Sequence, residues 1–342
     1  MKLGPGEFFE TAHQDFLSKG PAPRSGIDYA IGDQVIRVEI RSDSLTDRMT
    51  GALAHLELPE QPRVDLTIHA WDTARGGMLS PPWSESAYGP RGEIHGFNTE
   101  RFRTAFAHGS GALSMIDFEG RRALFWTRDA DCLPAYESAA PWRSILGWWM
   151  ERNHHLLIHA GLVARDGSAV ILAGPGGSGK STTALLCLQA GWKYLGDDYC
   201  LLQPVAPVRG YSLYNSAKIA RAWLHGVPQL KGVTDRSSAM HADKHLLFLN
   251  GKWSDHLLRS AGCKALFLPQ VVDQRETTVE KATPAEALRA LAPSSIFQTA
   301  AAGAFMFAQI SALVQRLPIR RLNLGRDLDQ IPPQMQNALA GV

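Results

Sequence analysis

Apolar residues follow two different patterns before and after a short Pro- and Ala-rich segment at residues 132–141. Before that segment, alternation of apolar and polar side chains predicts half-buried strands, most clearly at 35–40, where three apolar residues alternate with Arg37 and Glu39. Further expected elements are an amphipathic helix at 8–17, a helix from 43 toward 58, and strands at 64–71, 112–118 and 122–126. We therefore predict a small α+β domain over residues 1–135, as a candidate substrate-recognition domain.

The later part of the chain alternates buried-type strands with helices, which is typical of an α/β core. The expected strands are 156–163, 169–173, 194–202, 246–249 and 265–269, and the expected helices are 142–150, 181–190, 284–292 and 294–315. This predicts a second, α/β domain over residues 140–342.

Composition and charge exclude several classes of protein. With 45% hydrophobic and 20% charged residues and a net charge of +2, the chain is neither disordered nor a basic nucleic-acid binder. No apolar run is long enough to span a membrane, and the N-terminus lacks a signal-type apolar segment. The four cysteines form no CxxC pair, so we expect buried, reduced thiols. We therefore expect a cytoplasmic protein without nucleic-acid or membrane partners.

A phosphate-binding motif joins the strand at 168–173 to the helix at 181–190. It has the form G-x-x-x-x-G-K-[ST], in which glycines let backbone N–H groups surround phosphate oxygens and the helix N-terminus faces the same point. The lysine supplies a charge for the β- and γ-phosphates, and the first hydroxyl residue is a ligand for Mg²⁺. The predicted nucleotide-binding residues are Gly174, Pro175, Gly176, Gly177, Ser178, Gly179, Lys180, Ser181 and Thr182. ATP and Mg²⁺ are the expected cofactors.

Two adjacent carboxylates, Asp197 and Asp198, lie in the apolar segment 194–202. Side chains alternate along a strand, so both can face the phosphates only if the strand bends or ends, as Gly196 would allow. One carboxylate would bind the metal together with Ser181, and a second could accept a proton from a hydroxyl nucleophile. A histidine, His159, lies in the apolar segment 156–163, where taken alone it is more often a core residue than a catalytic one.

Together these residues resemble the catalytic core of HPr kinase/phosphorylase. The resemblance covers about residues 142–204 and is carried by His-Ala-Gly-Leu-Val at 159–163, Ser-Gly-Lys-Ser-Thr-Thr-Ala-Leu at 178–185, Ala-Gly-Trp at 190–192 and Gly-Asp-Asp-Tyr at 196–199. It is closer to the HPr-kinase-related proteins that phosphorylate serine or threonine, including kinases of lasso-peptide precursors. Weaker agreement continues at 265–269 and 317–328.

The resemblance implies a P-loop kinase fold related to phosphoenolpyruvate carboxykinase. The expected reaction is transfer of the γ-phosphoryl group of ATP to a Ser/Thr hydroxyl of a peptide or small protein, with a homo-oligomer as the assembly. The resemblance implies Lys180 at the phosphates, one of Asp197 and Asp198 as the base, and the other facing His159 or the metal. We expect Asp197 to be the base and Asp198 to pair with His159, and the reverse is the alternative.

One departure weakens the match to HPr kinase/phosphorylase itself. The Glu-x-Arg-Gly signature of that family has as its nearest counterpart Pro207-Val-Arg-Gly210, without the glutamate, so neither the phosphorylase reaction nor HPr as substrate follows. Basic residues available to phosphates or to an acidic acceptor are Arg209, Lys218, Arg221, Lys231 and Lys244. The other functions that fit the motifs are an ATP-hydrolysing regulatory switch and a kinase of a small hydroxy metabolite.

Overall fold

The computed structural model describes residues 3–18, 26–73, 80–220, 244–296 and 304–341, which form two compact units. The first unit ends at Arg152 and the second begins at Asn153. The boundary falls after helix α4 (Arg143–Arg152), whereas the sequence places it before this helix. The reason is packing: α4 buries Ile145, Leu146 and Met150 and contacts strand β6 (Ala112–Asp117) of the first unit.

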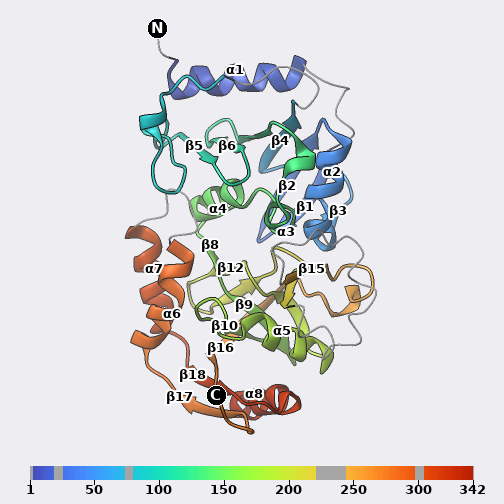
Figure 1. Ribbon diagram of the computed structural model, residues 1–342, viewed down its shortest axis with the longest axis vertical. Helices are drawn as coiled ribbons and strands as arrows, with labels where there is room; N and C mark the ends of the chain where they lie inside the picture. The colour runs from blue at the N-terminus through green and yellow to red at the C-terminus, as the bar shows by residue number, and fades with distance from the viewer. Residues whose placement is uncertain (1–2, 19–25, 74–79, 221–243, 297–303, 342) are drawn as a thin grey trace. The chain divides into compact units, whose positions relative to one another are not determined.

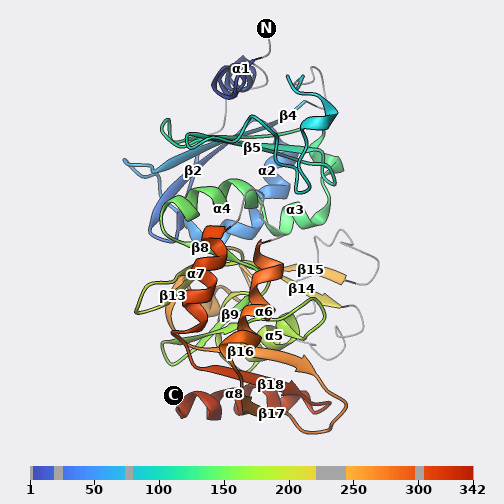
Figure 2. The same cartoon turned by 90° about the vertical axis from the view of Figure 1, so that its left-hand side faces the viewer.

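The first unit is a seven-stranded mixed sheet with helices on both faces (Figures 1 and 2). The strand order is β3-β1-β2-β4-β7-β6-β5, and β4 is parallel to both of its neighbours. Helix α1 covers one face, and α2, α3 and α4 lie on the other (Figure 2). The elements besides α4 and β6 are α1 (Pro5–Ser18), β1 (Ile27–Ile31), β2 (Gln34–Ile40), α2 (Asp43–Met49), η1 (Gly51–Leu56), β3 (Glu57–Leu58), β4 (Leu66–Asp72), η2 (Glu85–Ala87), β5 (Phe102–Ala107), β7 (Arg122–Thr127), η3 (Ala130–Cys132) and α3 (Ala135–Ala139).

The described strands of the second unit form a nine-stranded sheet and a separate β14–β15 pair. The main strand order is β11-β9-β10-β16-β13-β12-β8, with β18 pairing both β16 and β17. The elements are β8 (Leu156–Ile158), β9 (Gly161–Arg165), β10 (Ser168–Leu172), α5 (Lys180–Gln189), β11 (Lys193–Gly196), β12 (Cys200–Gln203), β13 (Arg209–Tyr211), β14 (Ser216–Ala220), β15 (Lys244–Phe248), η6 (Ser254–His256), β16 (Ser260–Val271), β17 (Thr278–Lys281), α6 (Pro284–Ile296), α7 (Ala304–Val314), β18 (Ile319–Leu324), η7 (Leu328–Gln330) and α8 (Ile331–Ala340).

Two hydrophobic cores lie on opposite faces of this sheet. Along β10, Ala169 and Ile171 join the core that contains α6 and α7, while Val170 and Leu172 join the core that contains α5 and α8. Alternating side chains of a strand point to opposite faces, so a continuous apolar run is what a strand covered by helices on both sides requires. The α/β class expected from the sequence is therefore present in the second unit.

Two segments expected as single strands are each divided. Residues 156–163 form β8 and β9 with His159 and Ala160 between them, and residues 194–202 form β11 and β12 with residues 197–199 between them. Hydrophobicity could not show these breaks, because residues on both sides of each break are buried.

Three helix ends also differ from expectation. The helix expected to run from 43 toward 58 ends at Met49 and is followed by a 3₁₀ turn. Helix α6 continues through Pro293 to Ile296, and α7 covers 304–314 of the long helix expected at 294–315. Residues 297–303 of that predicted helix lie outside the described residues.

Two further expectations concern membranes and thiols. Within the described residues, no helix is both long and apolar enough to cross a bilayer. All four cysteines are free; three are buried, but Cys132 is exposed because it ends the surface turn η3.

Candidate active site

The strand breaks bring the predicted site residues to one edge of the second unit. Strand β9 is antiparallel to both β10 and β11, so β10 and β11 run in the same direction and end at the same edge. The P-loop follows the end of β10, and Asp197 follows the end of β11. In register, Gly161 lies opposite Leu172, and Leu162 lies opposite Gly196.

The sheet must also curl at this edge. Strands β8 and β12 stand at one end of the strand order and β9 and β11 stand at the other, yet only two residues connect β8 to β9. The Cβ that an alanine at Gly210 would carry lies 2.6 Å from a side-chain carbon of Leu162, so β13 and β9 face each other at close range. Because β8 pairs with β12, with Ile158 opposite Cys200, His159 lies beside residues 197–199, which join β11 to β12.

The P-loop has the backbone conformation that its glycines permit. Gly177 and Gly179 have φ angles of 82° and 101°, in a region that residues with a Cβ rarely adopt. A Cβ at Gly179 would also lie 2.3 Å from Cδ1 of Leu324, so β18 closes against this part of the loop. Helix α5 begins at Lys180, immediately after the turn, and its N-terminus faces the loop.

Lys180 is bound back onto the P-loop itself. Its Nζ donates to the carbonyl oxygens of Gly174 at 2.6 Å and Pro175 at 3.0 Å, and only 7% of the residue is exposed. Burial lowers the pKa of Lys180, while the charges of Asp198 and Asp197 oppose that shift. Lys180 therefore lies within electrostatic range of both carboxylates.

Asp198 is bound on both of its oxygens. Nε2 of His159 lies 2.9 Å from Oδ1, and Nζ of Lys218, from β14, donates to Oδ2. Burial alone would raise the pKa of Asp198, but the bond from His159 and the charge of Lys218 outweigh it and hold that pKa well below its usual range. Asp198 is therefore ionised, and Nε2 of His159 carries the proton that the bond requires.

His159 is held from two further sides. Its backbone N–H donates to the Ser295 hydroxyl of α6 at 3.1 Å, and its ring packs edge-on against Tyr199 with 5.4 Å between centroids. The side chain is 13% exposed. The break between β8 and β9 thus orients an imidazole toward Asp198 instead of burying it inside a strand.

Asp197 has a different environment. It is 2% exposed, and its Oδ2 accepts a hydrogen bond from the backbone N–H of Lys218 at 3.1 Å. Burial and the charge of Asp198 raise the pKa of Asp197 to about 6, although Lys218 and the nearby Ser181 hydroxyl pull it down. Oδ1 is buried and accepts no hydrogen bond from the described residues. A buried carboxylate oxygen without a donor is costly unless a cation or a donor reaches it.

These residues fit a magnesium ion. Mg²⁺ prefers hard oxygen ligands, and the Ser181 hydroxyl and the Oδ1 atom of Asp197 are two such oxygens on adjacent elements. Both oxygens of Asp198, the third predicted metal ligand, are instead engaged by His159 and Lys218. Ser181 and Asp197 are thus the two residues that would hold the ion.

A cavity of about 450 Å³ borders the first half of the P-loop. This volume is within the usual range of small-molecule sites. Its charged lining residues are Arg289, Arg321 and Glu286, of which the last two form an ion pair. It is lined by residues 173–178 and 268–271, by Ala290 and by those three charged residues.

The basic residues singled out in the sequence fall into three groups. Lys218 contacts the carboxylates, and Lys244, paired with Ala220 in the β14–β15 ladder, lies near enough to Lys180 to affect its pKa. Arg209 pairs with Gln203, at the end of β12 remote from the aspartates, and binds the Ser260 hydroxyl. Arg221 and Lys231 lie outside the described residues.

Three contributors to the site were not expected in these roles. Tyr199 and Ser295 support His159, and Lys218 binds the carboxylates where the sequence suggested a phosphate or acceptor ligand. Tyr199 follows the aspartate pair directly, so the motif itself pointed to it. No sequence signal links Ser295 or Lys218 to the pair, because each comes from a distant element.

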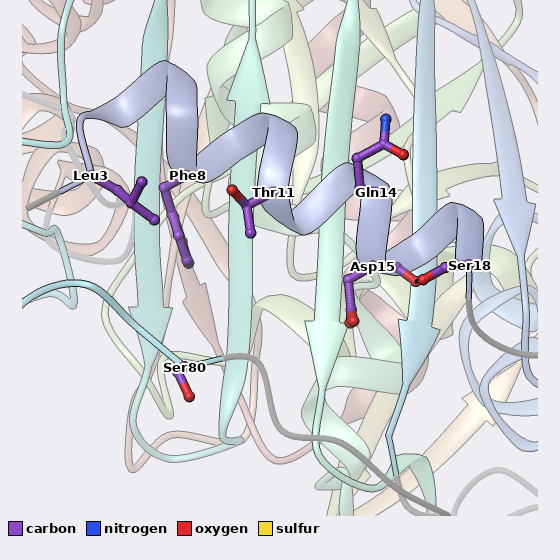
Figure 3. Close-up of a pocket in the computed structure, with 7 residues that line it drawn as sticks. All are labelled: Leu3, Phe8, Thr11, Gln14, Asp15, Ser18 and Ser80. Atoms are coloured by element: carbon purple, nitrogen blue, oxygen red, sulfur yellow. Dashed lines mark hydrogen bonds between the residues drawn. The ribbon is translucent and has the colours of Figure 1, made fainter.

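A second cavity, of about 420 Å³, lies along α1 in the first unit (Figure 3). Asp15 is the titratable side chain among the described residues that line it, and it accepts a hydrogen bond from Nε1 of Trp71 at 3.2 Å. The lining residues are Leu3, Phe8, Thr11, Gln14, Asp15, Ser18 and Ser80. This set contains no acid–base pair of the kind found at the P-loop.

Comparisons with known proteins give two similarities. Residues 145–213 match the family described as SynChlorMet cassette protein ScmC. The structure of the Hpr(Ser) kinase/phosphatase from Coxiella burnetii overlaps 54% of this chain and 97% of its own, with 11% sequence identity and a TM-score of 0.31. No curated protein matches the chain.

Proposed function

We propose that the protein is an ATP-dependent kinase that transfers the γ-phosphoryl group to a Ser/Thr hydroxyl of a peptide or small protein. One observation carries the proposal: the P-loop and Asp198, the carboxylate bound to His159, lie close together at one edge of the sheet. A nucleotide switch needs the P-loop and a metal ligand, but it has no use for a second carboxylate held toward an alcohol. A lasso-type precursor peptide is one acceptor of this class.

The phosphates of ATP would bind where the P-loop N–H groups and the α5 N-terminus point. To reach the phosphates, the ammonium group of Lys180 must break its hydrogen bonds to the carbonyl oxygens of Gly174 and Pro175. Nucleotide binding then replaces two neutral acceptors of Lys180 with charged phosphate oxygens. Ser181 and Asp197 would hold Mg²⁺, which supplies charge neutralisation at the β- and γ-phosphates.

Asp198 is the group that we assign to the acceptor hydroxyl. Its side chain is 19% exposed, whereas Asp197 is 2% exposed with Oδ1 sealed from solvent. Exposure therefore supports Asp197 on the metal and Asp198, the carboxylate bound to His159, toward the acceptor, which is neither of the two assignments expected from the sequence. His159 holds the Asp198 carboxylate in one orientation, since its own ring is held by Tyr199 and its backbone by Ser295.

In the proposed step the acceptor oxygen attacks the γ-phosphorus in line with the bond to the β,γ-bridging oxygen. The new P–O bond forms as that bond breaks, and ADP leaves with the electron pair. The hydroxyl proton passes to Asp198 only as the new bond completes, because the pKa of Asp198 is low and the acceptor oxygen becomes acidic once it bonds to phosphorus. Such a transfer depends mainly on positioning and on stabilising charge, which a preorganised site supplies without reorganisation.

The test uses the full-length protein, γ-labelled ATP, Mg²⁺ and peptides encoded beside its gene. Acid-stable, base-labile label on a serine or threonine supports the kinase. Release of inorganic phosphate at an unchanged rate with every peptide, and with no labelled peptide, contradicts it and favours the regulatory ATPase. If the label appears on a small hydroxy compound instead of a peptide, the proposed kinase reaction stands and the acceptor is the small compound.

A further inference from the structure

Lys218 contacts both carboxylates of the site through two different groups. Its backbone N–H donates to Oδ2 of Asp197 at 3.1 Å, and its Nζ donates to Oδ2 of Asp198. The lysine side chain is 19% exposed, as is that of Asp198, so the ion pair is mostly shielded from water. A mostly buried pair is screened less than a surface pair, so removal of one partner has a larger effect.

Strand β14 holds Lys218 in this place by its neighbours. Ala217 and Ile219, on either side, are buried in the core beneath α5, so the alternation of the strand turns Lys218 the other way. The Tyr194 hydroxyl of β11 donates to the carbonyl of Ser216 at 2.8 Å, which ties β14 to the strand that precedes the aspartates. The lysine is therefore fixed relative to the carboxylates by packing as well as by charge.

We infer that Lys218 is a positioning residue, which sets the separation between the carboxylate on the metal side and the carboxylate on the acceptor side. This inference rests on the proposed function for its catalytic consequence. Two adjacent carboxylates repel each other, and His159 binds Oδ1 of Asp198 only. The ammonium group of Lys218 binds the other oxygen, Oδ2, and this second hydrogen bond prevents the carboxylate from rotating about its Cβ–Cγ bond.

A phosphate ligand is the competing role for this lysine. The P-loop already supplies Lys180, and Nζ of Lys218 is engaged by Asp198. A phosphate ligand would contribute to ATP affinity, whereas a residue that acts through Asp198 would affect turnover and leave ATP affinity unchanged. The two roles are therefore separated by kcat and by the KM for ATP.

The experiment is a double-mutant cycle with K218M, D198N and the double variant, in the full-length protein with saturating Mg²⁺. We expect K218M to lower kcat at least tenfold with the KM for ATP within twofold of wild type. In the D198N background, K218M should change kcat less than twofold, because its effect passes through the carboxylate already removed. K264M, which removes an exposed lysine of β16, is the matched control and should match wild type.

Independent losses in kcat for the two single variants, or a rise of tenfold or more in the KM for ATP, would overturn the inference. K218R keeps the charge and is the second variant if K218M does not fold. It should retain more than a third of wild-type kcat, and an arginine variant with less than a tenth would also overturn the inference.

Melting temperatures of the same variants separate this inference from the proposed function. If the ion pair holds Asp198, K218M lowers the melting temperature in the wild-type background and lowers it less in the D198N background. If K218M lowers the melting temperature less in the D198N background but the wild type transfers no phosphoryl group, the proposed kinase function is rejected and the ion pair between Lys218 and Asp198 is retained. If the wild type transfers the phosphoryl group but K218M lowers the melting temperature equally in both backgrounds, the positioning role of Lys218 is rejected and the kinase function is retained.

Discussion

Nε2 of His159 lies 2.9 Å from Oδ1 of Asp198; His159 follows β8, and Asp198 lies two residues before β12, the strand that pairs with β8. The contact exists because β8 and β12 are antiparallel with Ile158 opposite Cys200, so the residues just beyond this pair lie side by side. It converts a histidine and an aspartate from separate apolar segments into an oriented pair beside a P-loop.

The first prediction concerns this pair. Replacing His159 with Phe keeps a ring against Tyr199 but removes the donor, so the Asp198 carboxylate loses one of its two fixed contacts. We expect kcat for phosphoryl transfer to fall about a hundredfold, the effect of a small misplacement of a reacting group, with the KM for ATP unchanged. His154→Asn, at an exposed position, is the control. Equal turnover in H159F and wild type would remove His159 from the mechanism.

The second prediction separates the two aspartates by their dependence on magnesium. Asp197→Asn should raise the Mg²⁺ concentration needed for half-maximal transfer, because one of the two oxygen ligands loses its charge. Asp198→Asn should lower kcat by about 10²–10⁴ at saturating Mg²⁺ without changing that concentration. Titrations of transfer rate against Mg²⁺ measure both effects. The opposite pattern would exchange the two roles and restore Asp197 as the base.

The third prediction concerns stability in metal-free, nucleotide-free buffer. The pKa of Asp197 is raised from 3.8 to about 6, so stability is highest when the group is protonated and is lost as the pH rises through about 6. Asp197→Asn avoids this loss. We expect the variant to exceed wild type in free energy of unfolding by about 3 kcal/mol at pH 8, and by much less at pH 4.

Chemical denaturation at the two pH values, with EDTA present, provides the measurement. If wild type and variant differed in stability by the same amount at pH 4 and pH 8, burial would not raise the pKa of Asp197 and this prediction would be wrong. A variant that is more stable but needs more Mg²⁺ for transfer is the behaviour expected where function requires an unfavourable charge.

The fourth prediction compares two glycines of the P-loop. Gly179→Ala places a Cβ at a φ of 101° and 2.3 Å from Leu324, which should cost at least about 1 kcal/mol and lower the melting temperature. Gly176→Ala meets no atom within 4 Å and should leave the melting temperature within one degree or so of wild type. Thermal unfolding without nucleotide measures the difference. Equal melting temperatures for the two variants would contradict the close approach of β18 to the loop.

Local sequence was sufficient for much of the second unit. The apolar run at 168–173 followed by glycines predicted β10, the P-loop and the start of α5, because each depends on neighbouring residues. Gly196 allowed a bend at the aspartates, although a single strand was expected over 194–202, and β11 ends at this glycine. Several elements of the fold were missed, including β1, β5, β13, β14, β17, β18 and α8, because these segments are short or interrupted by polar residues and acquire buried faces only in the folded units.

The sequence alone determined that a glycine-rich loop with a lysine and a hydroxyl residue at set spacing joins a buried strand to a helix, since these are local properties. It also placed two adjacent carboxylates within one apolar segment, beside a glycine that allows a bend. Only the tertiary structure decided which carboxylate meets His159, which lies beside Ser181, and that Lys218 binds both. These contacts depend on how the sheet curls and on where β14 packs, and the free energies that settle them come from contacts between residues far apart in the chain.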